Sequence, residues 1–154
     1  MNLLISDSNI LIDMEVSGLT AKMFDLPYTF AIPDILYYEE LEEEHSNLLE
    51  YGIQVLVLSS DTVKDMEVMV PKYPKASRND LFALALAKQE SCPLVTGDNA
   101  LRKACEKEEI DLLGTIWIID QLIHYKVIDM DIAHTAYVKM KENKRRLPWD
   151  VIGI

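Results

Sequence analysis

Three aspartates in this chain lie near the start of a helical pattern. Asp7 follows the apolar run NLLIS, Asp98 follows PLVTG, and Asp80 lies three residues after Ser77 in SRNDLFALALA. Aspartate is a preferred helix-capping residue, and Ser77 with Asp80 has the spacing of a capping box, so capping explains each residue taken alone. Serine, threonine or asparagine would cap equally well, however, and all three positions carry an ionisable side chain. The set therefore also fits a site built from carboxylates.

Clustered carboxylates would suit the hydrolysis of a phosphodiester. That reaction develops charge on the phosphoryl oxygens, the attacking water and the leaving oxygen, and hard divalent cations stabilise all three. Mg²⁺ and Mn²⁺ prefer oxygen ligands, whereas the sequence has no cluster of histidine and cysteine that would favour zinc. The three histidines are scattered over helical patterns and are interpreted as structural or exposed. The acids are compatible with metal-assisted hydrolysis, and the residues taken alone leave helix capping equally open.

The elements that must position these acids alternate between strand and helix. Short apolar runs predict strands, and longer amphipathic or helix-rich segments predict helices. The predicted strands are 2–6, 28–32, 54–59, 93–97 and a short one at 111–114; the predicted helices are 6–16, 34–52, one after the third strand, 77–91, 98–109, 115–126 and 131–146. This alternation predicts an α/β fold with a central parallel sheet, because each parallel pairing needs a crossover helix. Ligands of such sheets bind at the carboxyl ends of the strands, where Asp7 and Asp98 fall.

A fourth acid, Glu40, is not explained by capping. It lies within the predicted helix 34–52, which begins just after Pro33 and ends near Gly52. The buried stripe of that helix is predicted to comprise Tyr37, Tyr38, Leu41, His45 and Leu48. Glu40 lies at the shoulder of the stripe, but other glutamates of the run EELEEE also flank it. The helical wheel alone does not single out Glu40.

Length and composition predict one soluble domain. The chain has 154 residues, of which 49% are hydrophobic, and this suits a single well-buried core. The N-terminus lacks the features of a signal peptide, and the run TIWII is far too short to cross a bilayer. Two isolated cysteines indicate reduced thiols and no disulfide framework. We expect a cytoplasmic protein without membrane association.

The charge of the chain bears on its partners. Fifteen basic residues against 26 acidic ones give a formal net charge of −11, which repels nucleic acid at long range, so any such contact must be local. Lys72, Lys75 and Arg78 precede Asp80 and could meet phosphates, or they simply keep a loop soluble. The basic segment 139–146 offers either an RNA contact or cations that offset a helix dipole.

Four segments together resemble one family. The order SDSN, YYEEL, RNDLFALALA and LVTGDNALRKA resembles the PIN-domain nucleases, including the toxin halves of many bacterial toxin–antitoxin pairs. The resemblance covers nearly the whole chain, because LLGTIWIIDQLI and the closing RRLP also match one bacterial branch. It implies a single PIN-like domain over residues 1–154. By the same resemblance, the residues that hold divalent metal are Asp7, Glu40, Asp80 and Asp98, with Glu39 as the substitute if the register slips by one.

The resemblance also implies an activity and partners. The function it implies is a Mg²⁺- or Mn²⁺-dependent ribonuclease that hydrolyses RNA, and the candidate protein partner is an antitoxin that blocks the site. A second copy of the chain is a further candidate partner, which the sequence does not decide. Asn9 and Thr96 match small polar positions that could orient the carboxylates, although Asn9 suits a plain helix start equally well. The alternative is a catalytically silent PIN-like module that binds RNA or protein. A phospho-accepting receiver domain is disfavoured, because SDS, LSSD and LLGT do not supply its acidic and lysine positions.

Overall fold

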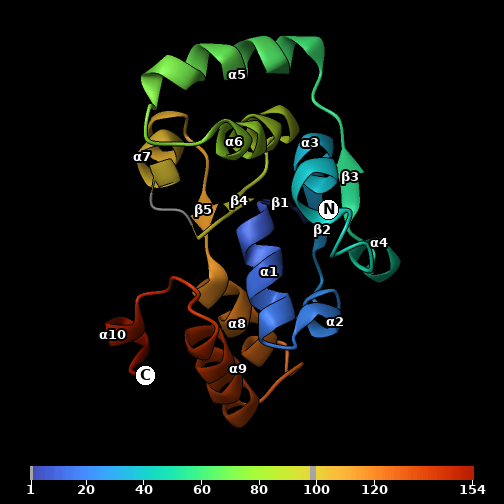
Figure 1. The fold of residues 1–154 in the computed structure, drawn as a ribbon, viewed down its shortest axis with the longest axis vertical. Coiled ribbons are helices and arrows are strands. Elements are labelled where there is room, and N and C mark those ends of the chain that lie inside the picture. The colour runs from blue at the N-terminus through green and yellow to red at the C-terminus, as the bar shows by residue number, and fades with distance from the viewer. Residues whose placement is uncertain (1, 98–99) are drawn as a thin grey trace.

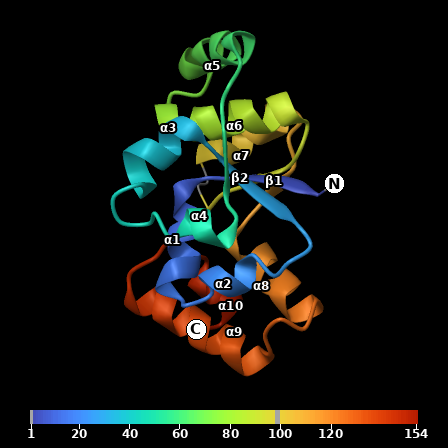
Figure 2. The same cartoon turned by 90° about the vertical axis from the view of Figure 1, so that its right-hand side faces the viewer.

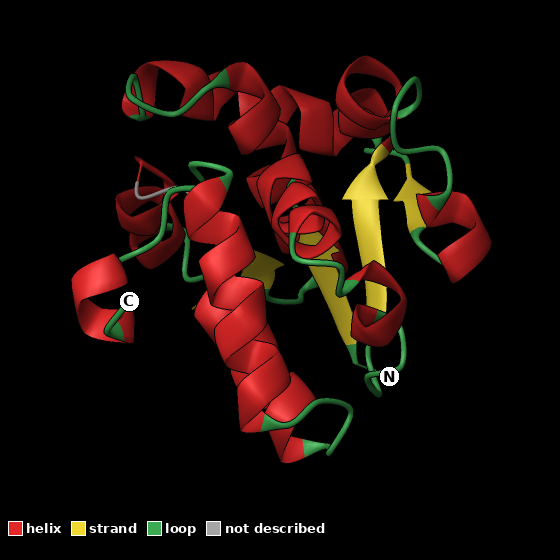
Figure 3. Cartoon of the chain, turned by 60° about the horizontal axis from the view of Figure 1, so that its bottom comes forward, coloured by secondary structure: helices red, strands yellow, loops and turns green. Residues whose placement is uncertain are grey.

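The computed structural model describes residues 2–97 and 100–154, and its centre is a parallel β-sheet of five strands. The strands are β1 (Leu3–Ser6), β2 (Thr29–Pro33), β3 (Gln54–Leu56), β4 (Leu94–Val95) and β5 (Leu112–Leu113). They run in the order β3-β2-β1-β4-β5, and every pairing is parallel (Figure 3). The predicted α/β fold with a parallel sheet is confirmed, and so are all five predicted strands.

Helices cover both faces of the sheet. On one side lie α1 (Ser8–Val16), α2 (Thr20–Met23), α8 (Thr115–His124) and α9 (Met130–Glu142), and on the other lie α6 (Arg78–Glu90) and α7 (Ala100–Lys107) (Figures 1 and 2). Helix α5 (Ser60–Lys72) packs on the outer side of α6, away from the sheet (Figure 1). No helix within residues 2–97 and 100–154 is long and apolar enough to cross a membrane.

On the face of the sheet covered by α6 and α7, α6 is the more buried helix because it has neighbours on two sides. It packs against β1, β2 and β4 on its inner side and against α5 on its outer side. Every residue of its central stretch 81–87, LFALALA, is buried. The small alanines allow close approach to the neighbouring layers, and the leucines and phenylalanine fill the remaining space. This packing holds the N-terminus of α6, and with it Asp80, firmly at the edge of the sheet.

The predicted continuous helix over 34–52 is wrong. The segment instead forms α3 (Asp34–Leu36), the π-helical turn η1 (Tyr37–Leu41) and, after a turn, α4 (Leu48–Tyr51). The π-turn is closed by the hydrogen bond from Glu42 N to Tyr37 O (2.8 Å), which spans five residues. A π-turn takes more residues than an α-turn and so rotates the side chains that follow. Two residues predicted to be buried are not: Tyr38 is 61% exposed and His45 is half-buried, whereas Tyr37, Leu41 and Leu48 are buried as expected.

The ends of the helices match the predictions in part. Helix α4 ends at Tyr51, and Gly52 caps it as predicted, where a φ of 110° favours glycine. Helix α9 ends at Glu142, before the predicted end at residue 146, and Asn143 donates its side-chain amide to the carbonyl of Lys139 (2.8 Å). The short helices α2 and α10 (Trp149–Ile152) were not predicted, because four residues are too few to show helical periodicity.

Candidate active site

Asp7 stands at the carboxyl end of β1 and is the N-cap of α1. The backbone N–H of Ile10 donates to its Oδ1 (3.1 Å), and the hydroxyl of Thr96, just beyond β4, donates to its Oδ2. The capping interpretation is therefore correct for Asp7, and Thr96 contacts this carboxylate. Capping does not explain burial, however, because Asp7 is only 2% exposed. Both of these donors are neutral groups.

Burial changes the acidity of Asp7. Loss of water around the carboxyl group raises its pKa from 3.8 to about 7. The hydrogen bonds from Thr96 and Ile10 oppose this change, and the negative charges of Asp80 and Asp13 raise the pKa further. Asp80 thus lies near enough to Asp7 for the two carboxylates to repel each other. A buried carboxylate beside a second one is unfavourable unless a cation or a proton compensates the charge.

Asp80 lies in the first turn of α6 and closes a capping box. Its backbone N–H donates to Ser77 Oγ (3.0 Å), and the backbone N–H of Ser77 donates to Asp80 Oδ2 (3.1 Å). The capping box predicted from the spacing is confirmed. Because the same residue acts electrostatically on Asp7, the cap also fixes the place of a second acid at this edge of the sheet.

Glu40 reaches this edge from the π-turn η1. Its Oε2 accepts a hydrogen bond from the hydroxyl of Ser8, and its Oε1 accepts one from the side-chain amide of Asn79 (2.8 Å). Ser8 follows Asp7 in the chain, and Asn79 precedes Asp80. Glu40 is therefore tied to the immediate neighbours of both aspartates. Glu39 accepts only a longer bond from Asn79 (3.2 Å), so the contacts favour Glu40 over its substitute.

Asp98 lies outside the described residues, and its predicted place at this edge stays a prediction. Within residues 2–97 and 100–154, no group of three or more histidine, cysteine, aspartate or glutamate side chains is gathered closely enough to hold a metal ion. The full four-carboxylate site therefore also remains a prediction. The described donors nevertheless fit a hard divalent cation: they are carboxylates, one is buried, and a bound cation would remove the repulsion between Asp7 and Asp80.

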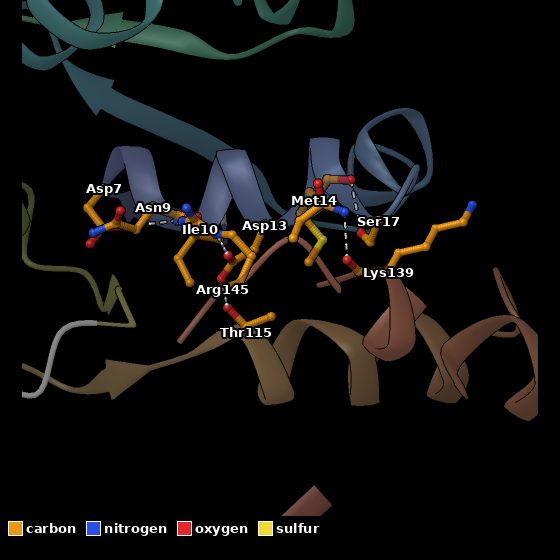
Figure 4. A network of polar contacts seen from close by, with 10 residues as sticks. Asp7, Asn9, Ile10, Asp13, Met14, Ser17, Thr115, Lys139 and Arg145 are labelled. Atoms are coloured by element: carbon orange, nitrogen blue, oxygen red, sulfur yellow. Dashed lines mark hydrogen bonds and ion pairs between the residues drawn. The ribbon is translucent and has the colours of Figure 1, made fainter. Parts of the chain in front are cut away.

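A second buried acid of α1 has a different environment. Asp13 is 4% exposed and forms an ion pair with Arg145, whose Nε donates a hydrogen bond to it (2.5 Å). It also accepts a hydrogen bond from Thr115 Oγ1 (2.7 Å) (Figure 4). Arg145 also donates to the backbone carbonyl of Asn9 (3.3 Å). Sequence reasoning missed this network. The only signal was an acid in the otherwise apolar stretch ILIDM, because the arginine that neutralises it lies far along the chain.

Two of the three basic residues ahead of Asp80, Lys72 and Arg78, are held by acids. Arg78 pairs with Glu67, and Lys72 donates to Glu108 (3.3 Å). Glu108 also accepts from Lys88 (2.8 Å) and from the hydroxyl of Tyr73 (2.5 Å), and these bonds lower its pKa to about 2. Lys72 and Arg78 would have to leave an acid before they could meet a phosphate.

A cavity of about 460 Å³ lies at the opposite, amino edge of the sheet. Its walls include the side chains of Tyr28 and Trp117, whose ring centroids are 5.4 Å apart, and the start of β1. Among the described residues, Asp7, Glu40 and Asp80 do not line it.

The parallel five-stranded sheet with helices on both faces defines a PIN-like α/β protein. A family model described as "DUF3368: PIN domain" matches residues 3–153, and the chain therefore belongs to the PIN domain family. This confirms the resemblance found in the sequence. No curated protein matches the chain.

Two solved structures resemble the fold at low sequence identity. A PilT N-terminus domain protein from the hyperthermophilic archaeon Sulfolobus solfataricus P2 has 12% identity and a TM-score of 0.55, with 79% of this chain and 93% of that chain covered. VapBC2 from Rickettsia felis, bound to a DNA fragment from its promoter, has 14% identity and a TM-score of 0.49, with 73% and 98% covered. The first supports the fold, and neither comparison establishes an activity for this chain.

Proposed function

We propose that residues 1–154 act as one PIN-domain ribonuclease that hydrolyses RNA phosphodiester bonds with Mg²⁺ or Mn²⁺. The observation that carries the proposal is the environment of Asp7. This carboxylate is 2% exposed, accepts hydrogen bonds from two neutral donors and is opposed by the charge of Asp80. Such an arrangement lowers stability, and a bound cation would offset that cost. Acids with strongly perturbed pKa values also cluster at functional sites.

In this proposal four carboxylates hold the ion: Asp7, Glu40, Asp80 and Asp98. When bound, the ion would polarise the phosphoryl group and lower the pKa of an attacking water. The chain itself fixes the carboxylates that would hold the ion. Thr96 and the amide of Ile10 hold both oxygens of Asp7, and Ser77 holds Asp80 at the start of α6. Carboxylates that are fixed in advance need no reorganisation when the ion and the substrate bind.

The role as the toxin of a toxin–antitoxin pair is part of the proposal and rests on the motifs shared with toxin-type PIN domains. A net charge of −11 favours a partner whose contact surface carries positive charge, because complementary charges speed association. An antitoxin with basic residues at its contact surface would therefore suit this chain. The measurement is the rate of RNA cleavage with and without the product of the neighbouring reading frame.

The ribonuclease proposal is tested by cleavage of a broad RNA panel in Mg²⁺ and in Mn²⁺. We expect wild-type cleavage to require the metal, and Asp80→Asn to lower the rate by about 100-fold or more, because a lost metal ligand removes transition-state stabilisation. Asparagine caps a helix almost as well as aspartate, so the unfolding free energy should change little. Asp131→Asn, a first-turn acid of α9, is the matched control and should retain full activity.

Two outcomes would contradict the proposal. Equal cleavage by wild type and Asp80→Asn would point to a contaminating nuclease. Absence of cleavage by both, in folded samples, would favour the catalytically silent module that binds RNA or protein.

A further inference from the structure

Asn79 joins two segments of the proposed site that are distant in sequence. It is the second residue of α6, directly before Asp80. Its side-chain amide donates to Glu40 Oε1 (2.8 Å) and to Glu39 Oε2 (3.2 Å), both on the π-turn η1. Helix α3, which leads into η1, packs against α6, so the two segments are held side by side. Asn79 is half-buried between them.

Glu40 needs external support if it is to act as a metal ligand. It is exposed, it lies on a turn of irregular geometry, and its long side chain has several rotatable bonds whose freedom is lost on binding. Glu39, Glu42 and Glu43 on the same segment are also exposed acids, and their charges favour a side chain that points away from the others. A hydrogen bond from a rigid helix therefore determines where the carboxylate lies.

The chemistry of the donor matters as much as its position. A lysine or arginine at residue 79 would neutralise Glu40 and compete with a cation for its oxygens. A neutral amide orients the carboxylate and leaves its negative charge for the ion. Ser8 supplies a second neutral donor, which contacts Glu40 Oε2. The two donors thus hold Glu40 beside the neighbours of Asp7 and Asp80.

We infer that Asn79 is a positioning residue that orients Glu40, rather than Glu39, toward the divalent ion. This inference rests on the proposed metal site and adds a residue to it. Outer residues that orient metal ligands commonly change metal affinity by about 10–100-fold when removed. A residue that only tied η1 to α6 would change stability without changing metal affinity.

The experiment measures Mn²⁺ affinity by calorimetry, together with the unfolding free energy in EDTA. We expect Asn79→Ala to weaken Mn²⁺ binding by about tenfold or more, with little change in metal-free stability, because its bonds lie at the surface. Asn79→Gln, which keeps the amide, should recover part of the affinity. Asn143→Ala is the matched control, since its amide donates to a carbonyl at the end of α9, and it should bind Mn²⁺ like wild type.

A double-mutant cycle identifies the glutamate through which Asn79 acts. In a Glu40→Gln background, Asn79→Ala should cause no further loss, whereas in a Glu39→Gln background it should still cause the full loss. The reverse pattern would assign the role to Glu39 and overturn the inference as stated.

The failures of the two proposals are distinguishable. If wild type binds no Mn²⁺, the metal site fails and the inference fails with it. If wild type binds Mn²⁺ and Asn79→Ala binds it equally well, only the inference is overturned. Should Asn79→Ala fail to fold, Asn79→Ser replaces it, because serine is tolerated in the first turn of a helix.

Discussion

Asp7 and Asp13 lie on the same short segment, are similarly buried and differ in their partners. Asp7 is 2% exposed and accepts hydrogen bonds from a hydroxyl and a backbone amide. Asp13 is 4% exposed and accepts from a hydroxyl and from the guanidinium of Arg145. Burial raises the pKa of Asp7 to about 7, and Asp13 has a cation that compensates its charge. Figure 4 shows both residues along α1, with Arg145 and Thr115 beside Asp13.

The difference separates two uses of a buried acid. Asp13 and Arg145 join α1 to the segment after α9, and Thr115 adds α8, so their charges serve the architecture. Among the described residues, the hydrogen-bond donors to Asp7 are neutral and do not compensate its charge, which suits its proposed role as a metal ligand at a cost in stability. Under the proposed function, the charge of the partners separates the structural acid from the functional one, and burial alone does not.

The largest effect is expected from the substitution Asp13→Asn. It leaves the Arg145 guanidinium without its carboxylate in a largely buried place, and breaking a buried ion pair costs about 3 kcal/mol or more. We expect a loss of about 3 kcal/mol in unfolding free energy, measured by urea denaturation at pH 8 in EDTA. Arg145→Met should show a loss of similar size. A change below about 1 kcal/mol in both variants would mean that this pair is not structural.

The corresponding substitution at Asp7, to asparagine, should raise the unfolding free energy and not lower it. The folded-state pKa of Asp7 is raised from 3.8 to about 7, so its contribution to stability is present below pH 4 and is lost as the pH rises through 7. At pH 8 in EDTA, Asp7→Asn should therefore be more stable than wild type by about 2 kcal/mol. The difference should shrink toward pH 4, as measured by urea denaturation across this range.

Metal should reverse this advantage. A divalent ion that binds only the native state stabilises it by roughly 2.7 kcal/mol at a hundredfold excess over Kd. We expect Mg²⁺ or Mn²⁺ to raise the melting temperature of wild type and to leave that of Asp7→Asn nearly unchanged. An equal rise in both proteins would place the bound ion elsewhere.

A smaller effect is expected at Glu108, whose charge is compensated near the surface. Its bonds from Lys88, Tyr73 and Lys72 lower its pKa from 4.5 to about 2. The stability that ionised Glu108 contributes is present above pH 4.5 and is lost as the pH falls toward 2. This window lies at lower pH than the window of Asp7. Because both lysines are about half exposed, solvent weakens the pairs, and Glu108→Gln should cost about 1 kcal/mol at pH 7. An unchanged unfolding free energy at pH 7 would contradict the role of this cluster.

Local patterns in the sequence were sufficient to predict most elements of the fold. The apolar runs predicted all five strands, and the alternation with helices predicted the parallel sheet, because both depend on short-range periodicity and on a general rule of chain connection. The capping box of Ser77 and Asp80 was also predicted, since it depends only on a spacing of three residues. The family followed from the order of motifs and is confirmed by the match over residues 3–153.

The tertiary structure decided which acids are compensated and how Glu40 is held. The π-turn at Tyr37–Leu41 broke a helix whose composition predicted continuity. The turn packs against α1 and the preceding α3 packs against α6, and such tertiary contacts can outweigh local propensity. The partners of Asp13 and Glu40 come from residues such as Arg145 and Asn79, more than 35 positions away in each case. The sequence by itself determined which residues can ionise and, for the strands and most of the longer helices, where the elements lie. Only the fold determined which charges meet, because electrostatic energy depends on distance in space and on burial, and neither can be obtained from separation along the chain.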